Sequence, residues 1–295
     1  MQIVRTWLIA VRPVSLTASV VPVLVGTAVA AGEAFRPALF ALALAGAVAM
    51  QAGTNLINDY FDHVKGSDTA ESLGPSGVIQ RGLLTPCAVF AGGGGAFAVA
   101  AAIGLAITAV VGWPVLALGV ASVLAGYFYT ASPLSLAYRG LGEAVVFIFM
   151  GPVIVVGAYY VQTEEWASAP FLASLPVGML VAAILHANNV RDIEGDRRNR
   201  KWTLAALAGR PLADYEYAAL VGGAYVALIA VVTLTVAWTA LLPLLTLPPA
   251  ARLIADEFRA RSPRRLNAVL ARTAGLHLLF GLLFALGLAV DAWID

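Results

Sequence analysis

Two short acidic stretches contain the side chains best suited to chemistry in this chain. The first is "TNLINDYFDHVKGSDT", residues 54–69, and the second is "HANNVRDIEGDRRNRKWTLA", residues 186–205. In each, Asn residues stand at the end of an apolar run, Asp residues come next, and basic residues follow. The two stretches therefore form a loose internal repeat.

The spacing within both stretches places polar oxygens on one face if the backbone is helical, because residues four apart are neighbours on a helix surface. In the first stretch this spacing relates Asn55 to Asp59 and Asn58 to Asp62. In the second it relates Asn188, Asp192 and Asp196. Each stretch is predicted to direct a short ladder of oxygen ligands to one side.

Carboxylates crowded in this way repel one another and hold protons unless a cation lies between them. Mg²⁺ prefers oxygen ligands and is usually held by one or two carboxylates together with substrate phosphates. Basic residues beside the ladders suit the remaining charge of a diphosphate. They are Lys65, Arg81, Arg191, Arg200 and Lys201. The pattern predicts a clamp for a metal and a diphosphate. The alternative, solvated charges at helix ends, explains one such stretch better than it explains two of the same form.

The composition indicates a polytopic membrane protein. Of the 295 residues, 60% are hydrophobic and 12% are charged, and the mean hydropathy is +0.85. The single cysteine, Cys87, excludes an internal disulfide. A formal net charge of +1 gives no reason to expect a nucleic-acid partner.

We predict an all-α integral membrane protein with one domain, residues 1–295, in which nine transmembrane helices surround a central cavity. A spanning helix needs about 20 mostly apolar residues. The predicted spans are 14–32, 38–57, 87–111, 114–131, 142–161, 170–189, 214–237, 239–255 and 272–291. The eighth is the weakest, because it is short and contains three prolines.

The basic residues support this count. Cytoplasmic loops are enriched in Lys and Arg. With a cytoplasmic N-terminus, nine spans place all of the 18 Lys and Arg residues except Arg36 on the cytoplasmic side. The opening "MQIVRTWLIAVRPVS" lacks a small-residue cleavage site and is interpreted as a retained lead-in. We expect a multi-pass protein of the inner cell membrane whose active site faces the cytoplasm.

Four segments resemble the UbiA superfamily of intramembrane aromatic prenyltransferases. "NDYFDHVKGSDT", followed by "GP" and "RGLLTP", resembles the first aspartate motif, and "NNVRDIEGDRRNRKWTLA" resembles the second. "RPVSLTASVVPVLVG" and "YTASPLSLAYRGLGE" also fit. Within the superfamily these motifs most resemble those of the branch that acts on 1,4-dihydroxy-2-naphthoate in menaquinone biosynthesis.

The resemblance implies that the aspartate motifs bind Mg²⁺ and a polyprenyl diphosphate at the cytoplasmic mouth of the cavity. By motif position, the metal sites comprise Asp59 and Asp62, with Asp68 in support, and Asp192 and Asp196. The residues expected to bind substrate are Asn55, Asn58, Lys65, Arg81, Arg139, Asn188, Asn189, Arg191 and Lys201. Tyr129 stands where the family has a tyrosine near the reacting carbon.

The expected reaction transfers a polyprenyl group to 1,4-dihydroxy-2-naphthoate, with loss of carbon dioxide and diphosphate, and gives a demethylmenaquinol. Arg139 and Arg191 are the candidates for holding the carboxylate of the acceptor. Other acceptors stay open: 4-hydroxybenzoate, homogentisate, a tetrapyrrole or a glycerol phosphate. A secondary transporter is the alternative of a different class, because intramembrane acids also mark ion pathways. Membrane lipid is the expected surrounding partner.

Overall fold

The chain folds into a bundle of helices. The structure is a computed structural model and describes residues 2–68, 76–235 and 237–294. Within these ranges there is no β-strand, only one isolated bridge between Arg139 and Trp202. The elements are α1 (Gln2–Val11), η1 (Pro13–Leu16), α2 (Thr17–Val29), α3 (Pro37–Val64), α4 (Pro86–Val111), α5 (Trp113–Phe128), η2 (Leu136–Tyr138), α6 (Gly142–Ile148), η3 (Phe149–Val153), α7 (Ile154–Thr163), α8 (Ser168–Arg198), α9 (Leu204–Ala208), α10 (Arg210–Thr235), η4 (Trp238–Thr246), α11 (Leu247–Arg259) and α12 (Pro263–Ile294).

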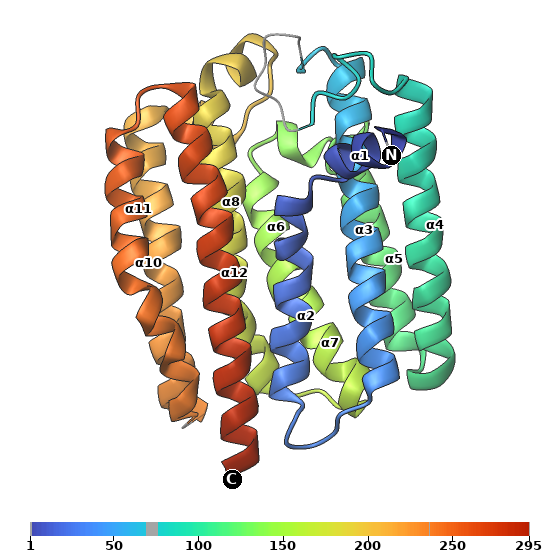
Figure 1. Ribbon diagram of the computed structural model, residues 1–295, viewed down its shortest axis with the longest axis vertical. Coiled ribbons are helices and arrows are strands. Elements are labelled where there is room, and N and C mark those ends of the chain that lie inside the picture. The colour runs from blue at the N-terminus through green and yellow to red at the C-terminus, as the bar shows by residue number, and fades with distance from the viewer. Residues whose placement is uncertain (1, 69–75, 236, 295) are drawn as a thin grey trace.

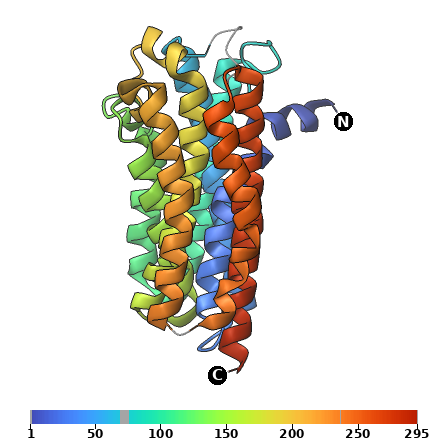
Figure 2. The same ribbon diagram turned by 90° about the vertical axis from the view of Figure 1, so that its left-hand side faces the viewer.

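The long helices run nearly parallel to one axis (Figures 1 and 2). α8 packs against α10, α12 and the segment α6–η3, while α3 packs against α4. The N-terminal helix α1 lies near the end of the bundle where α3 and α8 end and projects sideways from it, and α12 ends at the opposite end (Figures 1 and 2). Both acidic stretches therefore reach the same end of the molecule.

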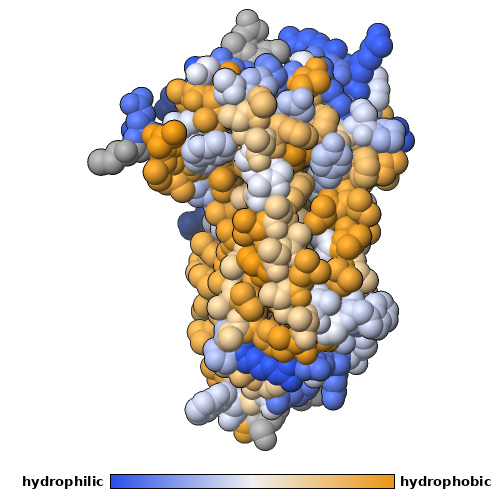
Figure 3. Space-filling model, turned by 90° about the vertical axis from the view of Figure 1, so that its right-hand side faces the viewer, coloured by the Kyte–Doolittle hydropathy of each residue, from blue (hydrophilic) through white to orange (hydrophobic). Residues whose placement is uncertain are grey.

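On the face shown in Figure 3, apolar residues cover the middle of the bundle, and hydrophilic residues gather at its two ends. Large apolar side chains such as Val99, Leu105 and Val226 are exposed. A surface with many such side chains is stable where lipid covers it. Together with the hydropathy of its helices, this apolar surface identifies a multi-pass membrane protein.

The predicted count of nine spans is not confirmed, although each predicted range overlaps a helical segment. In the described part of the chain, seven helices are long and apolar enough to cross a membrane, or up to eight if the bent pair Gln2–Val11 and Pro13–Val29 is one span. The pair bends by 49°. α5 has 16 residues, fewer than the ~20 that a straight span requires.

The two helices that bear the acidic stretches continue beyond the predicted ends of their spans. α3 runs to Val64, where Gly66, with φ of +72°, allows the chain to turn. The backbone amides of Ser67 and Asp68 then donate to the Asp62 carbonyl at 2.9 and 3.3 Å. α8 runs to Arg198. The helical register assumed for both ladders is therefore present.

Close helix packing relies on glycine in the half of the bundle around α12. A Cβ at Gly281 would collide with Val21 of α2. The neighbouring core is apolar and buried, with Val25, Leu180 and Phe280 among its members. Small residues let membrane helices approach closely, so this contact fixes α2 against α12. Because α2 also packs against α3, the contact helps to position the helix that bears the first acidic stretch.

Candidate active site

The two acidic stretches meet at one end of the bundle. The side-chain amide of Asn199 donates to the carbonyl of Ser67 at 3.3 Å, across 132 positions of sequence. The Lys201 Nζ lies 3.6 Å from an oxygen of Asp62. These contacts place the end of α3 beside the end of α8, as a single clamp requires.

Asp59 is buried and ion-paired. The guanidinium of Arg12 donates to one carboxylate oxygen, and the hydroxyl of Ser76 donates to the other. Arg12 joins α1 to η1 in a left-handed backbone conformation, with φ of +59°. Its Nε is buried without a hydrogen-bond partner in the described residues, so the guanidinium keeps a donor for a further anion.

Asp62 is held by a tyrosine and a lysine. The hydroxyl of Tyr138 donates to its Oδ1 at 2.6 Å and lies 2.7 Å from the hydroxyl of Ser67. Lys65 and Lys201 place their Nζ atoms 4.2 and 5.3 Å from the centroid of the Tyr138 ring. Tyr138 thus contacts a carboxylate and both lysines that were predicted to bind diphosphate.

The loop groups at this end have shifted pKa values. Burial, and next the charge of Asp62, raises the pKa of Asp68 to about 6. Burial lowers the pKa of Lys65. Burial acts in the same direction on Lys201, but the carboxylates of Asp62 and Asp196 outweigh it and raise the pKa of Lys201. A half-buried lysine beside several carboxylates is suited to bind an anion.

The second ladder is organised by Arg191, whose side chain is 3% exposed. Its guanidinium forms a bidentate ion pair with Asp192, in which the Nε donates to Oδ1 at 2.7 Å. It also donates to Asn188 at 2.9 Å and to Asn267 of α12 at 2.6 Å. Asp196 is buried and accepts a hydrogen bond from Thr203 at 3.3 Å. The ladder residues Asn188 and Asp192 thus share one cation.

A polar network within the membrane supports this ladder from behind. The Asn189 amide donates to Oε1 of Glu143 at 2.9 Å, and Nδ1 of His186 lies 3.1 Å from the same oxygen. Nε2 of His186 lies 2.9 Å from the carbonyl of Ala213. Asn189, which was expected to bind substrate, therefore points to Glu143, while its neighbour Asn188 lines the cavity.

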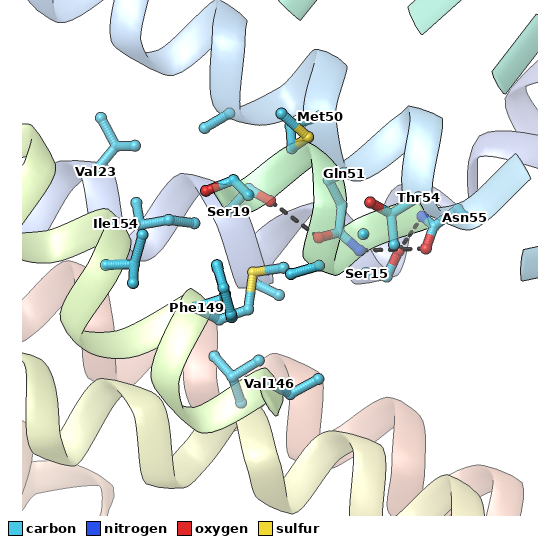
Figure 4. A pocket seen from close by; sticks show the side chains of 18 of the residues that line it. Ser15, Ser19, Val23, Met50, Gln51, Thr54, Asn55, Val146, Phe149 and Ile154 are labelled. Carbon is cyan, nitrogen blue, oxygen red and sulfur yellow. Dashed lines mark hydrogen bonds between the residues drawn. The ribbon is translucent and has the colours of Figure 1, made fainter. Parts of the chain in front are cut away.

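A cavity of about 630 Å³ extends from the ladders into the bundle. Its polar residues include Arg12, Asn55, Asn58, Asn188 and Arg191, and most of the remaining wall is apolar. Figure 4 shows Ser15, Ser19, Gln51 and Asn55 on one wall, with Val146 and Phe149 across from them. The arrangement can hold a charged head beside the ladders and an apolar body within the membrane.

The other predicted residues divide between the cavity and the loops. Tyr129 lines the cavity, and Asn58 accepts a hydrogen bond from Thr130 at 2.9 Å. Arg81 is exposed and donates to the Gly77 carbonyl of its own turn at 3.1 Å. Arg139 is exposed and donates to the Pro133 carbonyl at 2.8 Å. Neither arginine lines the cavity.

Three residues at the site were not identified from the sequence. Arg12 was counted in the positive-inside pattern and opens the segment "RPVSLTASVVPVLVG", but it was given no role at the site. Gln51 lies one turn before Asn55 in an apolar span and extends the first ladder by the same four-residue step. Tyr138 carried no signal of this kind, because its contact with Asp62 joins positions 76 apart in sequence.

The oxygen ligands fit Mg²⁺ better than a softer metal. The described residues contain no group of three or more His, Cys, Asp or Glu side chains close enough to hold a metal ion. The site instead offers three carboxylates that each form an ion pair with a nearby cation: Asp59 with Arg12, Asp62 with Lys201, and Asp192 with Arg191. Paired carboxylates suit a metal that arrives with phosphate ligands of its own.

Comparison with known proteins agrees with this geometry. Residues 19–283 match the model of the UbiA prenyltransferase family. The 1,4-dihydroxy-2-naphthoate octaprenyltransferase of Bacillus subtilis is 34% identical, over 95% of this chain and 91% of the relative. The enzyme of the same name from Escherichia coli is 35% identical, over 99% and 98%.

The fold also matches a solved structure. A UbiA homolog from Archaeoglobus fulgidus, bound to GPP and Mg²⁺, superposes with a TM-score of 0.63 at 18% identity, covering 95% of this chain and 99% of that chain. The family match extends over both acidic stretches and every long helix from α3 to α10. The chain therefore belongs to the UbiA prenyltransferase family.

Proposed function

We propose that this protein transfers a polyprenyl group from an allylic diphosphate to 1,4-dihydroxy-2-naphthoate and releases diphosphate and carbon dioxide, giving a demethylmenaquinol. The observation that carries the proposal is the pair of acidic ladders, each with its own cations, at the mouth of an apolar cavity. The choice of acceptor is supported by the names of the two bacterial relatives.

Asp59, Asp62, Asp192 and Asp196 would hold Mg²⁺, with Asp68 beside them. When bound, the metal would stabilise negative charge on the departing diphosphate. The relative from Archaeoglobus fulgidus was solved with GPP and Mg²⁺, which supports Mg²⁺ and a prenyl diphosphate as the ligands.

The cations that now pair with these carboxylates would bind the phosphate oxygens. Arg12 keeps a buried donor without a partner, and Arg191 and Lys201 lie at the same mouth. Fixed donors directed at the leaving group favour cleavage of the allylic C–O bond. The tail of the prenyl group would lie in the apolar part of the cavity, where water cannot quench the allylic cation.

The acceptor ring would then attack this cation. Two hydroxyl groups make the ring electron-rich, and a new C–C bond forms at the carbon that bears the carboxylate. The C–C bond to the carboxylate breaks, carbon dioxide leaves, and its bonding electrons restore aromaticity. Of the two predicted candidates for the acceptor carboxylate, only Arg191 lines the cavity, whereas Arg139 is exposed. Arg191 would therefore contact this carboxylate as well as the diphosphate. Tyr129 would lie near the reacting carbon.

The location follows from the charge pattern. We propose an inner-membrane protein whose ladders face the cytoplasm, with α1 on the same side. Arg36 is the one basic residue that is expected on the outer side. It forms an ion pair with Glu164 at 2.5 Å in the loops at the opposite end of the bundle, which agrees with this orientation.

The test is an assay of the purified protein in lipid vesicles with octaprenyl diphosphate, Mg²⁺ and a panel of acceptors. We expect prenylated product only with the naphthoate or chiefly with it, and one carbon dioxide per product by mass spectrometry. Faster prenylation of 4-hydroxybenzoate, or a product that retains its carboxyl group, would overturn the choice of acceptor. Absence of diphosphate release with every acceptor would overturn the transferase itself.

A further inference from the structure

A run of hydrogen-bonded polar side chains lines one wall of the cavity (Figure 4). Starting at the mouth, the Asn55 amide donates to the hydroxyl of Ser15 at 2.8 Å. The Gln51 amide donates to Oδ1 of Asn55 at 3.2 Å, and the hydroxyl of Ser19 donates to Oε1 of Gln51 at 3.2 Å. The run passes from the Arg12 end of the site into the interior of the bundle.

Gln51 is the unusual member of this run. It lies within an apolar span, is 8% exposed and lines the cavity. A glutamine amide has two N–H donors, and the hydrogen bonds of the described residues account for one of them. A polar side chain at membrane depth is costly unless it is satisfied or functional. The second donor is therefore available to a molecule in the cavity.

The facing wall is apolar. Val146, Phe149 and Ile154 come from α6, η3 and α7, opposite the polar run (Figure 4). The backbone at Phe149–Val153 forms a short π-helix, a feature frequent at functional sites. The space between the two walls has hydrogen-bonding groups on one side and apolar side chains on the other.

Such a space discriminates between the two substrates of the proposed reaction. A prenyl chain has no hydrogen-bonding group, so it leaves the amide of Gln51 unsatisfied. An aromatic ring with hydroxyl substituents can accept a hydrogen bond from the Gln51 amide through a hydroxyl oxygen at the ring edge. The flat face of the same ring can pack against the apolar wall. The polar run also begins beside Arg12, so a ring placed there lies next to the leaving diphosphate.

We infer that Gln51, supported by Ser19, binds a ring hydroxyl of the aromatic acceptor and helps to select dihydroxy aromatic carboxylates. This inference rests on the proposed function, because it assigns a subsite for its acceptor. Gln51 is a specificity residue in this assignment, while the carboxylates and arginines at the mouth hold the diphosphate.

The test compares 1,4-dihydroxy-2-naphthoate with 1-hydroxy-2-naphthoate in the wild-type protein, Gln51→Met and Ser19→Ala. The missing hydroxyl also makes the ring less reactive, so the wild-type ratio of kcat/KM combines contact and chemistry. Only the change in that ratio on mutation reports the contact. We expect Gln51→Met to reduce the preference for the dihydroxy substrate roughly tenfold, the effect of one buried hydrogen bond, and Ser19→Ala to reduce it less. The KM for octaprenyl diphosphate should change less than this ratio, because Gln51 reaches the first ladder only through Asn55.

Ser122→Ala is the matched control. Ser122 also lines the cavity, but its hydroxyl donates to the Leu118 carbonyl of its own helix at 2.8 Å, so the ratio should not change. An unchanged ratio in Gln51→Met and Ser19→Ala, or an equal change in Ser122→Ala, would overturn the inference. Neither result touches the proposed function, which fails instead if the wild-type protein does not prenylate the dihydroxynaphthoate.

Discussion

Replacing Tyr138 with Phe should weaken the binding of Mg²⁺ and diphosphate without moving the aromatic ring. The substitution removes only the hydroxyl that donates to Asp62 at 2.6 Å and lies 2.7 Å from the hydroxyl of Ser67. The ring beneath Lys65 and Lys201 stays in place. Tyr138 is therefore expected to act through Asp62, by fixing one carboxylate oxygen while the other stays available to a ligand.

The expected size follows from the hydrogen bond that is lost. A hydrogen bond to a charged group contributes about 1.5–3 kcal/mol, and partners that orient metal ligands typically change metal affinity about 10- to 100-fold. We expect the concentration of Mg²⁺ that gives half-maximal activity, and the KM for prenyl diphosphate, to rise by about tenfold or more. Tyr138→Leu should be worse, because it also removes the cation–π contacts, each contributing about 0.5–2 kcal/mol.

The assay titrates Mg²⁺ and octaprenyl diphosphate separately, with diphosphate release as the readout and the acceptor saturating. Tyr127→Phe is the control: its ring packs against Phe61 with centroids 5.7 Å apart, and its hydroxyl makes no hydrogen bond within the described part of the chain. Unchanged or lowered values in Tyr138→Phe would refute the reasoning, because the hydroxyl would then only occupy Asp62 until a metal replaces it.

Three further predictions test the ladders, the topology and the packing. Asp59→Asn and Asp192→Asn should each reduce turnover at least 100-fold, and EDTA should abolish it until Mg²⁺ is restored; substantial activity in both variants, measured by product formation, would exclude a two-ladder clamp. With the exposed Cys87 replaced by Ser, a cysteine at Ser67 should react with a membrane-impermeant reagent only from the cytoplasmic face, and a reporter fused after the last residue should lie on the other face; if both lie on one face, the number of spans between them is even. Gly281→Ala should destabilise the protein by about 1–3 kcal/mol, because the added carbon meets Val21, whereas Gly275→Ala in the same helix has open space and should leave thermal unfolding in detergent nearly unchanged.

The sequence predicted the helices and the ladders because both depend on local spacing. Asn55 and Asp59 share a face whenever the segment is helical, so the four-residue step was sufficient. The number of spans was harder to predict, because apolar runs do not reveal that α5 is only 16 residues long or that the chain bends between α1 and α2. Contacts between distant segments, such as Tyr138 with Asp62, carry no periodic signal and required the fold.

The pairing of every ladder with a cation explains how so charged a site is tolerated at the end of an apolar bundle. Isolated charges moved out of water are costly, and partners reduce that cost. Here Arg12, Lys201 and Arg191 pair with Asp59, Asp62 and Asp192.

When a magnesium diphosphate enters, its positive and negative parts can exchange with these pairs: carboxylates turn to the metal, and arginine and lysine turn to the phosphates. In that exchange neither the carboxylates nor the cations of the site are left without a partner of opposite charge. The arrangement also explains why removing a single carboxylate should be severe, because it leaves a largely buried cation without a partner before the substrate binds and removes a ligand of the metal afterwards.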